Sequence, residues 1–95
     1  MNRFELTVIV PFYNEEKTLQ TAVFNLLNEN FASEILLIDD GSSDLSNEIA
    51  RELAKKFSEV RLVESQENIG KGHAVRLGIN NASKKYIGVL DADLE

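Results

Sequence analysis

The strict alternation of short apolar runs with segments of helical periodicity is the strongest constraint on the fold of this chain. Four runs rich in Val, Ile and Leu have the length of buried strands, and they lie at residues 6–10, 35–38, 60–63 and 86–90. The third run contains a charged residue, Arg61, which is typical of a strand near the edge of a sheet.

Between these runs, apolar residues recur every three or four positions and predict three helices. The helical positions are Leu19, Ala22, Val23, Leu26 and Leu27, then Ile49, Leu53, Ala54 and Phe57, and then Val75, Gly78, Ile79 and Ala82. The order β-α-β-α-β-α-β predicts a Rossmann-like α/β fold with a parallel sheet, right-handed connections and helices on both faces. We expect residues 1–95 to form one domain.

Three local details accompany this prediction. Pro11 is expected to end the first strand, because proline cannot donate to a strand ladder. Ser43 or Asp44 is expected to cap the second helix. Gly78, which lacks a side chain, is expected to let the third helix approach the sheet closely.

Composition excludes several functional classes. The formal net charge of −6 argues against a nucleic-acid partner, because non-specific affinity for nucleic acid comes mainly from Lys and Arg. The chain has no cysteine, which excludes disulfides, thiolate zinc sites and cysteine nucleophiles. Its apolar runs are only strand-sized, so we expect neither a membrane span nor a signal peptide, and the prediction is a cytoplasmic domain.

Polar residues follow each of the four predicted strands. In open parallel sheets, ligands bind beyond the carboxyl ends of the strands, at the point where the strand order reverses. We therefore expect the four strand exits to converge on one edge of the sheet. Carboxylates gathered there are costly without a cation or a ligand rich in donors, so a binding site is favoured. The exits are residues 11–16, 39–44, 64–72 and 91–95.

Asp91 and Asp93 are the candidate metal ligands. They lie two residues apart after an apolar strand, so in an extended segment their side chains point the same way and can share one hard cation, Mg²⁺ or Mn²⁺. The alternative is a polar loop that simply follows a strand, and from this pair alone the two interpretations have about equal weight.

Other candidates each have a structural alternative. Tyr13 can stack on a base or pack within its loop, and Glu15 can accept a hydrogen bond from a nucleotide or compensate a helix dipole. A carboxylate of Asp39 or Asp40 can accept from a base N–H, with Gly41 allowing close backbone approach, or these residues can form a turn with a helix cap. Lys71 can bind phosphate or be a solvated cation at a helix entry.

Taken in order, four segments resemble family 2 glycosyltransferases of the GT-A fold, and the match covers nearly the whole chain. The segments 68–72 and 91–95 look like those of the polyprenyl-phosphate sugar transferases, such as dolichyl-phosphate mannose and glucose synthases. The resemblance implies a donor site whose base and ribose are surrounded by Pro11, Tyr13, Glu15, Ile38 and Asp40, with Asp91, Ala92 and Asp93 near the diphosphate. Asp91 and Asp93 would hold the metal. The four segments are 8–15, 38–44, 68–72 and 91–95.

The function implied by this resemblance is transfer of a sugar from a UDP- or GDP-linked donor to an acceptor such as a polyprenyl phosphate, at the cytoplasmic face of a membrane in a full-length protein. Because the sequence stops at the Asp-Ala-Asp motif, we expect the N-terminal, donor-binding half alone, with no efficient transfer. An exposed sheet edge is expected to favour a homo-oligomer.

Two alternatives come from other classes. One is a non-catalytic nucleotide-binding or interaction module. The other is a receiver-type signalling domain that binds Mg²⁺, but such a domain needs a phosphoacceptor Asp after the third strand and a Lys after a fifth. Here the third predicted strand leads into Glu64-Ser65-Gln66, and no fifth strand is predicted.

Overall fold

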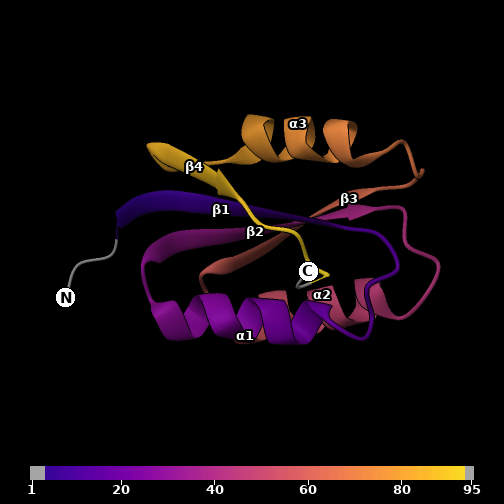
Figure 1. Ribbon diagram of the computed structural model, residues 1–95, viewed down its shortest axis with the longest axis horizontal. Helices are drawn as coiled ribbons and strands as arrows, with labels where there is room; N and C mark the ends of the chain where they lie inside the picture. The colour runs from indigo at the N-terminus through magenta and orange to yellow at the C-terminus, as the bar shows by residue number, and fades with distance from the viewer. Residues whose placement is uncertain (1–3, 94–95) are drawn as a thin grey trace.

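Seven elements alternate along residues 4–93, the part of the chain that the computed structural model describes (Figure 1). The predicted order of strands and helices is confirmed. The elements are β1 (Phe4–Phe12), α1 (Leu19–Glu29), β2 (Ala32–Asp40), α2 (Ser46–Lys56), β3 (Val60–Ser65), α3 (Lys71–Asn81) and β4 (Tyr86–Val89). None of the helices in this part of the chain is long and apolar enough to cross a bilayer.

The four strands form one parallel sheet in the order β3-β2-β1-β4. The strand at Val60–Ser65 lies at an edge, as its interrupting charge predicted. From β1 the chain winds outward through β2 to β3, and β4 then pairs with the other side of β1. The strand order therefore reverses between β1 and β4, and that is where a ligand site is expected.

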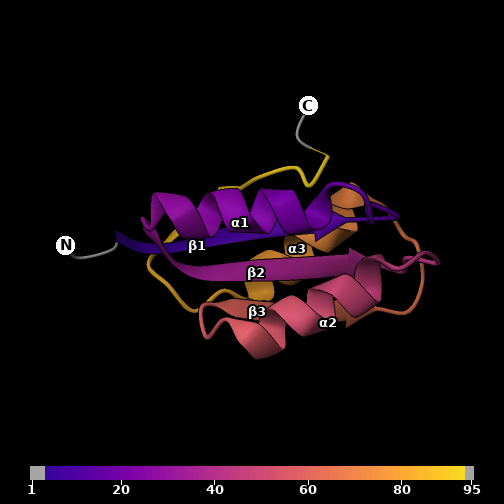
Figure 2. The ribbon, with the colours of Figure 1, turned by 90° about the horizontal axis from the view of Figure 1, so that it is seen from below.

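The sheet is covered on both faces, by α1 and α2 on one side and by α3 on the other (Figures 1 and 2). Successive side chains of β1 point to opposite faces of the sheet. Val8 and Val10 belong to the cluster that includes residues of α1 and α2, whereas Ile9 packs with Ala74 of α3. Because both faces of the inner strands are buried, their sequences are continuous apolar runs instead of alternating ones.

Gly78 brings α3 close to the sheet, as predicted. A Cβ atom at this position would lie 2.5 Å from Cγ2 of Ile9, a side chain that is itself fully buried. Any larger residue would push the helix away from β1.

The prediction that Pro11 ends the first strand was wrong, because β1 continues to Phe12 and Pro11 lies level with Ile38 of β2. The carbonyl of Ile9 accepts a hydrogen bond from the N–H of Leu90, so Ile9 and, two residues on, Pro11 turn their backbone groups toward β4. The paired residues of β4 end at Val89, level with Ile9. The missing N–H of Pro11 thus lies on the side of β4, where the pairing stops at Val89, and it leaves the pairing with β2 intact as far as Phe12.

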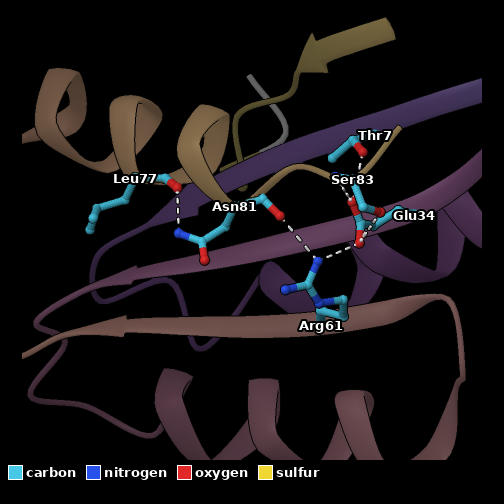
Figure 3. A network of polar contacts seen from close by, with 6 residues as sticks. All are labelled: Thr7, Glu34, Arg61, Leu77, Asn81 and Ser83. Atoms are coloured by element: carbon cyan, nitrogen blue, oxygen red, sulfur yellow. Dashed lines mark hydrogen bonds and ion pairs between the residues drawn. The ribbon is translucent and has the colours of Figure 1, made fainter. Parts of the chain in front are cut away.

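A buried carboxylate joins the strands at the end of the sheet opposite the strand exits (Figure 3). Glu34 of β2 accepts hydrogen bonds from Thr7 Oγ1 of β1 at 2.7 Å and from an Arg61 guanidinium N–H of β3 at 2.6 Å. It also accepts from the N–H and Oγ of Ser83, both at 3.0 Å, in the connection to β4. Arg61 also donates to the carbonyl of Asn81 at the end of α3.

Glu34 makes stability dependent on pH. Burial alone raises the pKa of this carboxyl, but the hydrogen bonds from Arg61, Ser83 and Thr7 outweigh it and lower the pKa from 4.5 to about 2. Folding thus favours the ionised form of Glu34. Its contribution to the unfolding free energy is complete above the pKa that Glu34 has in the unfolded chain, and it is lost as pH falls from about 4.5 toward 2.

We predict that Glu34→Gln lowers the unfolding free energy at pH 7 by on the order of 3 kcal/mol, because the charged partner of Arg61 is lost. The difference from the parent should shrink as pH falls below 4.5, where the carboxyl of the parent becomes protonated in the unfolded chain. Urea unfolding of both proteins at a series of pH values measures this difference in unfolding free energy. A difference that stays constant down to the lowest pH would contradict this assignment.

Candidate functional site

A cavity of about 290 Å³ lies at the carboxyl ends of the strands, where the strand order reverses. Its lining comes from the exits of β1, β2 and β4, from the β3–α3 loop and from the start of α3, so the predicted convergence of all four exits is confirmed. The lining residues are Pro11, Phe12, Tyr13, Glu15, Asp40, Asn68, Gly70, Lys71, Ala74, Asp91, Ala92 and Asp93.

The loops after β1 and β2 are tied together through Asn14, a residue whose role the sequence did not reveal. Its Oδ1 accepts hydrogen bonds from the backbone N–H groups of Ser43 at 2.8 Å and Asp44 at 3.2 Å, and its own N–H donates to Ser42 Oγ at 2.9 Å. Asn14 has a φ of 54°, a left-handed conformation that Asn tolerates better than most residues. That tolerance is the one signal in the sequence that favours Asn here.

The start of α2 completes this connection between the loops. Ser46 Oγ accepts the N–H of Glu15 at 2.7 Å, and the carboxylate of Asp44 accepts the N–H groups of Ser46 at 2.8 Å and Glu16 at 3.2 Å. The N-cap position of α2 is Leu45, which makes no side-chain cap hydrogen bond, so the prediction that Ser43 or Asp44 caps this helix was wrong. Asp44 instead accepts the N–H of Ser46 from the position before the cap. Burial raises the pKa of Asp44, but the hydrogen bonds from Ser46 and Glu16 outweigh it and hold the pKa below its usual value.

The loop–loop contacts place Tyr13 and Glu15 at the cavity. The ring of Tyr13 is 44% exposed, so it is available to a planar ligand. Glu15 lines the same cavity and accepts a hydrogen bond from Thr18 Oγ1 at 3.1 Å, within the turn that leads to α1.

The two adjacent aspartates at the end of β2 have different partners. Asp39 accepts from the N–H of Ser42 at 2.8 Å and from Asn47 Nδ2 at 2.8 Å, so it fixes the turn and the first turn of α2. Asp40 lines the cavity, although only 4% of the residue is exposed.

Asp40 holds the β3–α3 loop in place. Its Oδ2 accepts from Asn68 Nδ2 and from the N–H of Gly70, both at 2.9 Å, and its Oδ1 accepts from the N–H of Ile69 at 3.2 Å. Gly41, at φ 79°, lets this loop approach, because a Cβ there would lie 2.7 Å from the carbonyl carbon of Glu67. The close approach at Gly41 is thus made by the chain itself.

Lys71 begins α3 immediately after Gly70, and its ammonium group forms an ion pair with Oδ1 of Asp91. The pair joins the amino end of α3 to the exit of β4. Both side chains are accessible to solvent, with 61% of Lys71 and 50% of Asp91 exposed.

Ala92 anchors the segment that carries the two candidate metal ligands. It is only 2% exposed and packs in the cluster that contains Phe12 and Leu19. Residues 92–93 form a turn, so the segment is not the extended one that the sequence argument assumed, yet Asp91 and Asp93 both line the cavity. Leu94 and Glu95, the last residues of the motif, lie outside the described residues.

Ile38, one of the predicted site residues, does not line the cavity, and neither does Glu64 of β3. Ile38 is fully buried with Ile9 and Leu36 beneath it. Glu64, at the exit of β3, accepts from Asn47 Nδ2 at 2.7 Å and from Arg51 at 2.9 Å, and these hydrogen bonds lower its pKa. From the β3–α3 connection the cavity receives Asn68 and Gly70 instead.

Asp91 and Asp93 fit a hard divalent cation that takes its remaining ligands from elsewhere. Within residues 4–93, no group of three or more His, Cys, Asp or Glu side chains is arranged to hold a metal ion. Mg²⁺ is commonly bound by one or two carboxylates together with water and substrate phosphates, so two carboxylates beside a cavity match this chemistry. The Lys71 ammonium shows that a cation can sit beside Asp91.

We predict that Asn14→Ala lowers the unfolding free energy by about 2 kcal/mol, because two backbone N–H groups lose their acceptor and alanine is strained at a left-handed φ. Asn14→Gly should lose only about 1 kcal/mol, since glycine adopts this φ freely. Urea unfolding gives both values, and amide exchange at Ser43 and Asp44 should accelerate in both variants. Parent-like exchange at these two amides would show that Asn14 does not hold the loops together.

The comparisons with known proteins agree with this geometry. Residues 7–95 of this chain match the family described as "Glycosyl transferase family 2". A dolichyl-phosphate beta-glucosyltransferase of Mus musculus is 35% identical over 100 residues, which cover 94% of this chain and 31% of the relative. Among the first relatives matched, the chain spans from 13% to 38% of their length.

Solved structures show the same arrangement. Mannosyltransferase PcManGT from Pyrobaculum calidifontis, in complex with GDP-Man and Mn²⁺, has a TM-score of 0.86 at 28% identity, covering 98% of this chain and 28% of that protein. TarS 1-349 of S. aureus, in complex with UDP-GlcNAc, has a TM-score of 0.83 at 25% identity, and the match covers 93% of this chain and 26% of that protein. The receiver-type alternative does not agree with these matches. The four-stranded sheet is therefore part of a GT-A fold, and the chain belongs to glycosyl transferase family 2.

Proposed function

We propose that this chain is the donor-binding part of a metal-dependent glycosyltransferase that uses a nucleotide diphosphate sugar. The observation that carries the proposal is the cavity at the strand-order reversal, which combines an exposed aromatic ring, carboxylates and a lysine at a helix amino end. The complexes of similar proteins with GDP-Man and UDP-GlcNAc support it. Non-catalytic nucleotide binding is the alternative that the same cavity allows.

In this proposal the β1 and β2 exits recognise the nucleoside. Tyr13 and Pro11 offer apolar surfaces to the base and ribose, and Glu15 accepts from ribose hydroxyls or a base N–H. Asp40 has three donors on its two oxygens, which leaves acceptor capacity on Oδ1 for a base N–H. Ile38 is fully buried, so its contribution is to the packing of β2, the strand that carries Asp40.

The β4 exit and the start of α3 form the diphosphate end of the proposed site. Asp91 and Asp93 would hold Mg²⁺ or Mn²⁺, with Ala92 fixing their position. The ion supplies charge stabilisation for the departing nucleoside diphosphate. Lys71 and the amino end of α3 add positive potential at the phosphates. Complexes of similar proteins with Mn²⁺ support a divalent cation.

A polyprenyl phosphate is the acceptor that we propose for the full-length protein. The dolichyl-phosphate beta-glucosyltransferases of Mus musculus, Trichomonas vaginalis and Drosophila melanogaster support this acceptor, since they are 33% to 38% identical to the chain. An anionic phosphate oxygen can attack the anomeric carbon with little help from a general base. We place this reaction at the cytoplasmic face of a membrane.

Calorimetric titration with UDP, GDP and their sugar conjugates tests the proposed donor site. We expect one nucleotide to bind in the presence of Mn²⁺ and to bind at least tenfold more weakly in EDTA. The double variant Asp91→Asn/Asp93→Asn should lose the gain in nucleotide affinity that Mn²⁺ gives, because it removes both charged oxygen ligands. Glu48→Gln/Glu52→Gln, an equal change of charge on α2, is the matched control. A nucleotide affinity that changes neither with Mn²⁺ nor with the Asp91/Asp93 substitutions would exclude the proposed metal site.

We also propose that a second copy of this chain pairs with β4. Within residues 4–93 this strand pairs with β1 alone. Its apolar residues Tyr86, Ile87 and Val89 are exposed, as is Leu90, which follows it. Two copies related by a two-fold axis can pair these edges antiparallel and bury the apolar side chains together.

Analytical ultracentrifugation of the 95-residue chain tests this pairing. We expect a dimer at high concentration and a monomer for Ile87→Lys/Val89→Lys, since charged residues on an edge strand oppose strand pairing. Ile79→Lys, at an exposed apolar position of α3, should dimerise as the parent does. A parent chain that remains monomeric throughout would rule out the pairing.

A further inference from the structure

The ion pair between Lys71 and Asp91 occupies the place where the proposed site needs a different cation. Oδ1 of Asp91 is one of the oxygens assigned to the divalent ion, and in this structure it contacts the ammonium group of Lys71. An ammonium and a divalent ion at the same carboxylate repel each other, so the ion pair with Lys71 weakens the binding of a divalent ion to Asp91. Lys71 and the metal therefore compete for Asp91.

The surroundings of Lys71 let the side chain move while its backbone stays fixed. The loop before it is held by Asp40, which accepts the N–H groups of Ile69 and Gly70. The side chain itself is 61% exposed and forms an ion pair with Asp91. Exposed ion pairs of this kind contribute little stability, so a stronger competitor can replace the contact.

We infer that Lys71 is an internal counter-ion, which neutralises Asp91 before the donor arrives and then passes to the diphosphate when the divalent ion takes its place. The inference rests on the proposed donor site. A free divalent ion must displace Lys71 without compensation, whereas an ion that arrives with a nucleoside diphosphate brings negative oxygens for the displaced ammonium. Metal and nucleotide binding are thereby coupled, and each strengthens the other by the same factor.

The charge balance of the site supports this exchange. Asp91 and Asp93 line the cavity together, and with Lys71 bound to Asp91 part of their repulsion is relieved. Asp91, Asp93 and the two negative charges of a sugar-linked diphosphate together outweigh one divalent ion, and Lys71 then offsets part of this excess. The flexible stem of Lys71 starts at the first residue of α3, so the ammonium can turn to a phosphate at the helix amino end without a change in the fold.

The test measures Mn²⁺ affinity without nucleotide, from the electron paramagnetic resonance signal of free Mn²⁺. We expect Lys71→Met to bind Mn²⁺ at least fivefold more tightly than the parent, because the competitor is gone. Lys71→Arg keeps the charge and should stay close to the parent. Lys55→Met, an exposed position on α2, makes the same change of net charge and should alter the affinity by less than twofold.

A second titration measures the coupling with UDP and with GDP. In the parent, the nucleotide that it binds should raise the affinity for Mn²⁺ by some factor. In Lys71→Met this factor should be at least fivefold smaller. Equal Mn²⁺ affinities for Lys71→Met and Lys55→Met, or no Mn²⁺ binding by any of the variants, would overturn the inference. If Lys71→Met gains Mn²⁺ affinity but no protein binds either nucleotide, the counter-ion role stands and the proposed donor site fails.

Discussion

The parallel pairing of β1 with β2, buried on both faces, is the constraint on which the site depends. It sets Phe12 level with Asp39 and thereby brings the two loops that follow into contact. Because β4 joins β1 from the other side, the exit of β4 meets the exit of β1 at the same edge. The close packing of Gly78 on Ile9 holds α3 against this pair, so the amino end of α3 also reaches the cavity.

Charged groups at the two ends of the sheet have different roles. At one end, Glu34 is buried and all its partners are supplied by the protein, so this carboxylate stabilises the arrangement of the strands. At the other end, Asp91 is half exposed and its partner is a flexible lysine. A charge that is fully satisfied by fixed partners is suited to structure, whereas an accessible charge with a mobile partner is suited to binding.

Most of the fold and much of the site could be predicted from the sequence. The order of elements, the edge position of the run at 60–63 and the convergence of the strand exits are confirmed, as is the approach of α3 at Gly78. The end of the first strand was predicted too early, because Pro11 lacks an N–H only on the side of β4, and pairing with β2 continues past it. Asn14 was missed, since its partners lie 28 to 30 residues away in the chain.

The sequence by itself determined the periodicity of each segment, the order of the elements and the strand exits that carry polar groups. These properties are local, because spacings of two and of three to four residues decide which side chains share a face. Only the tertiary structure decided that Asp40 holds the β3–α3 loop, that Ile38 is buried away from the cavity, and that Lys71 pairs with Asp91. These contacts join residues far apart in the chain, and their geometry follows from how strands and helices pack, which no local spacing specifies.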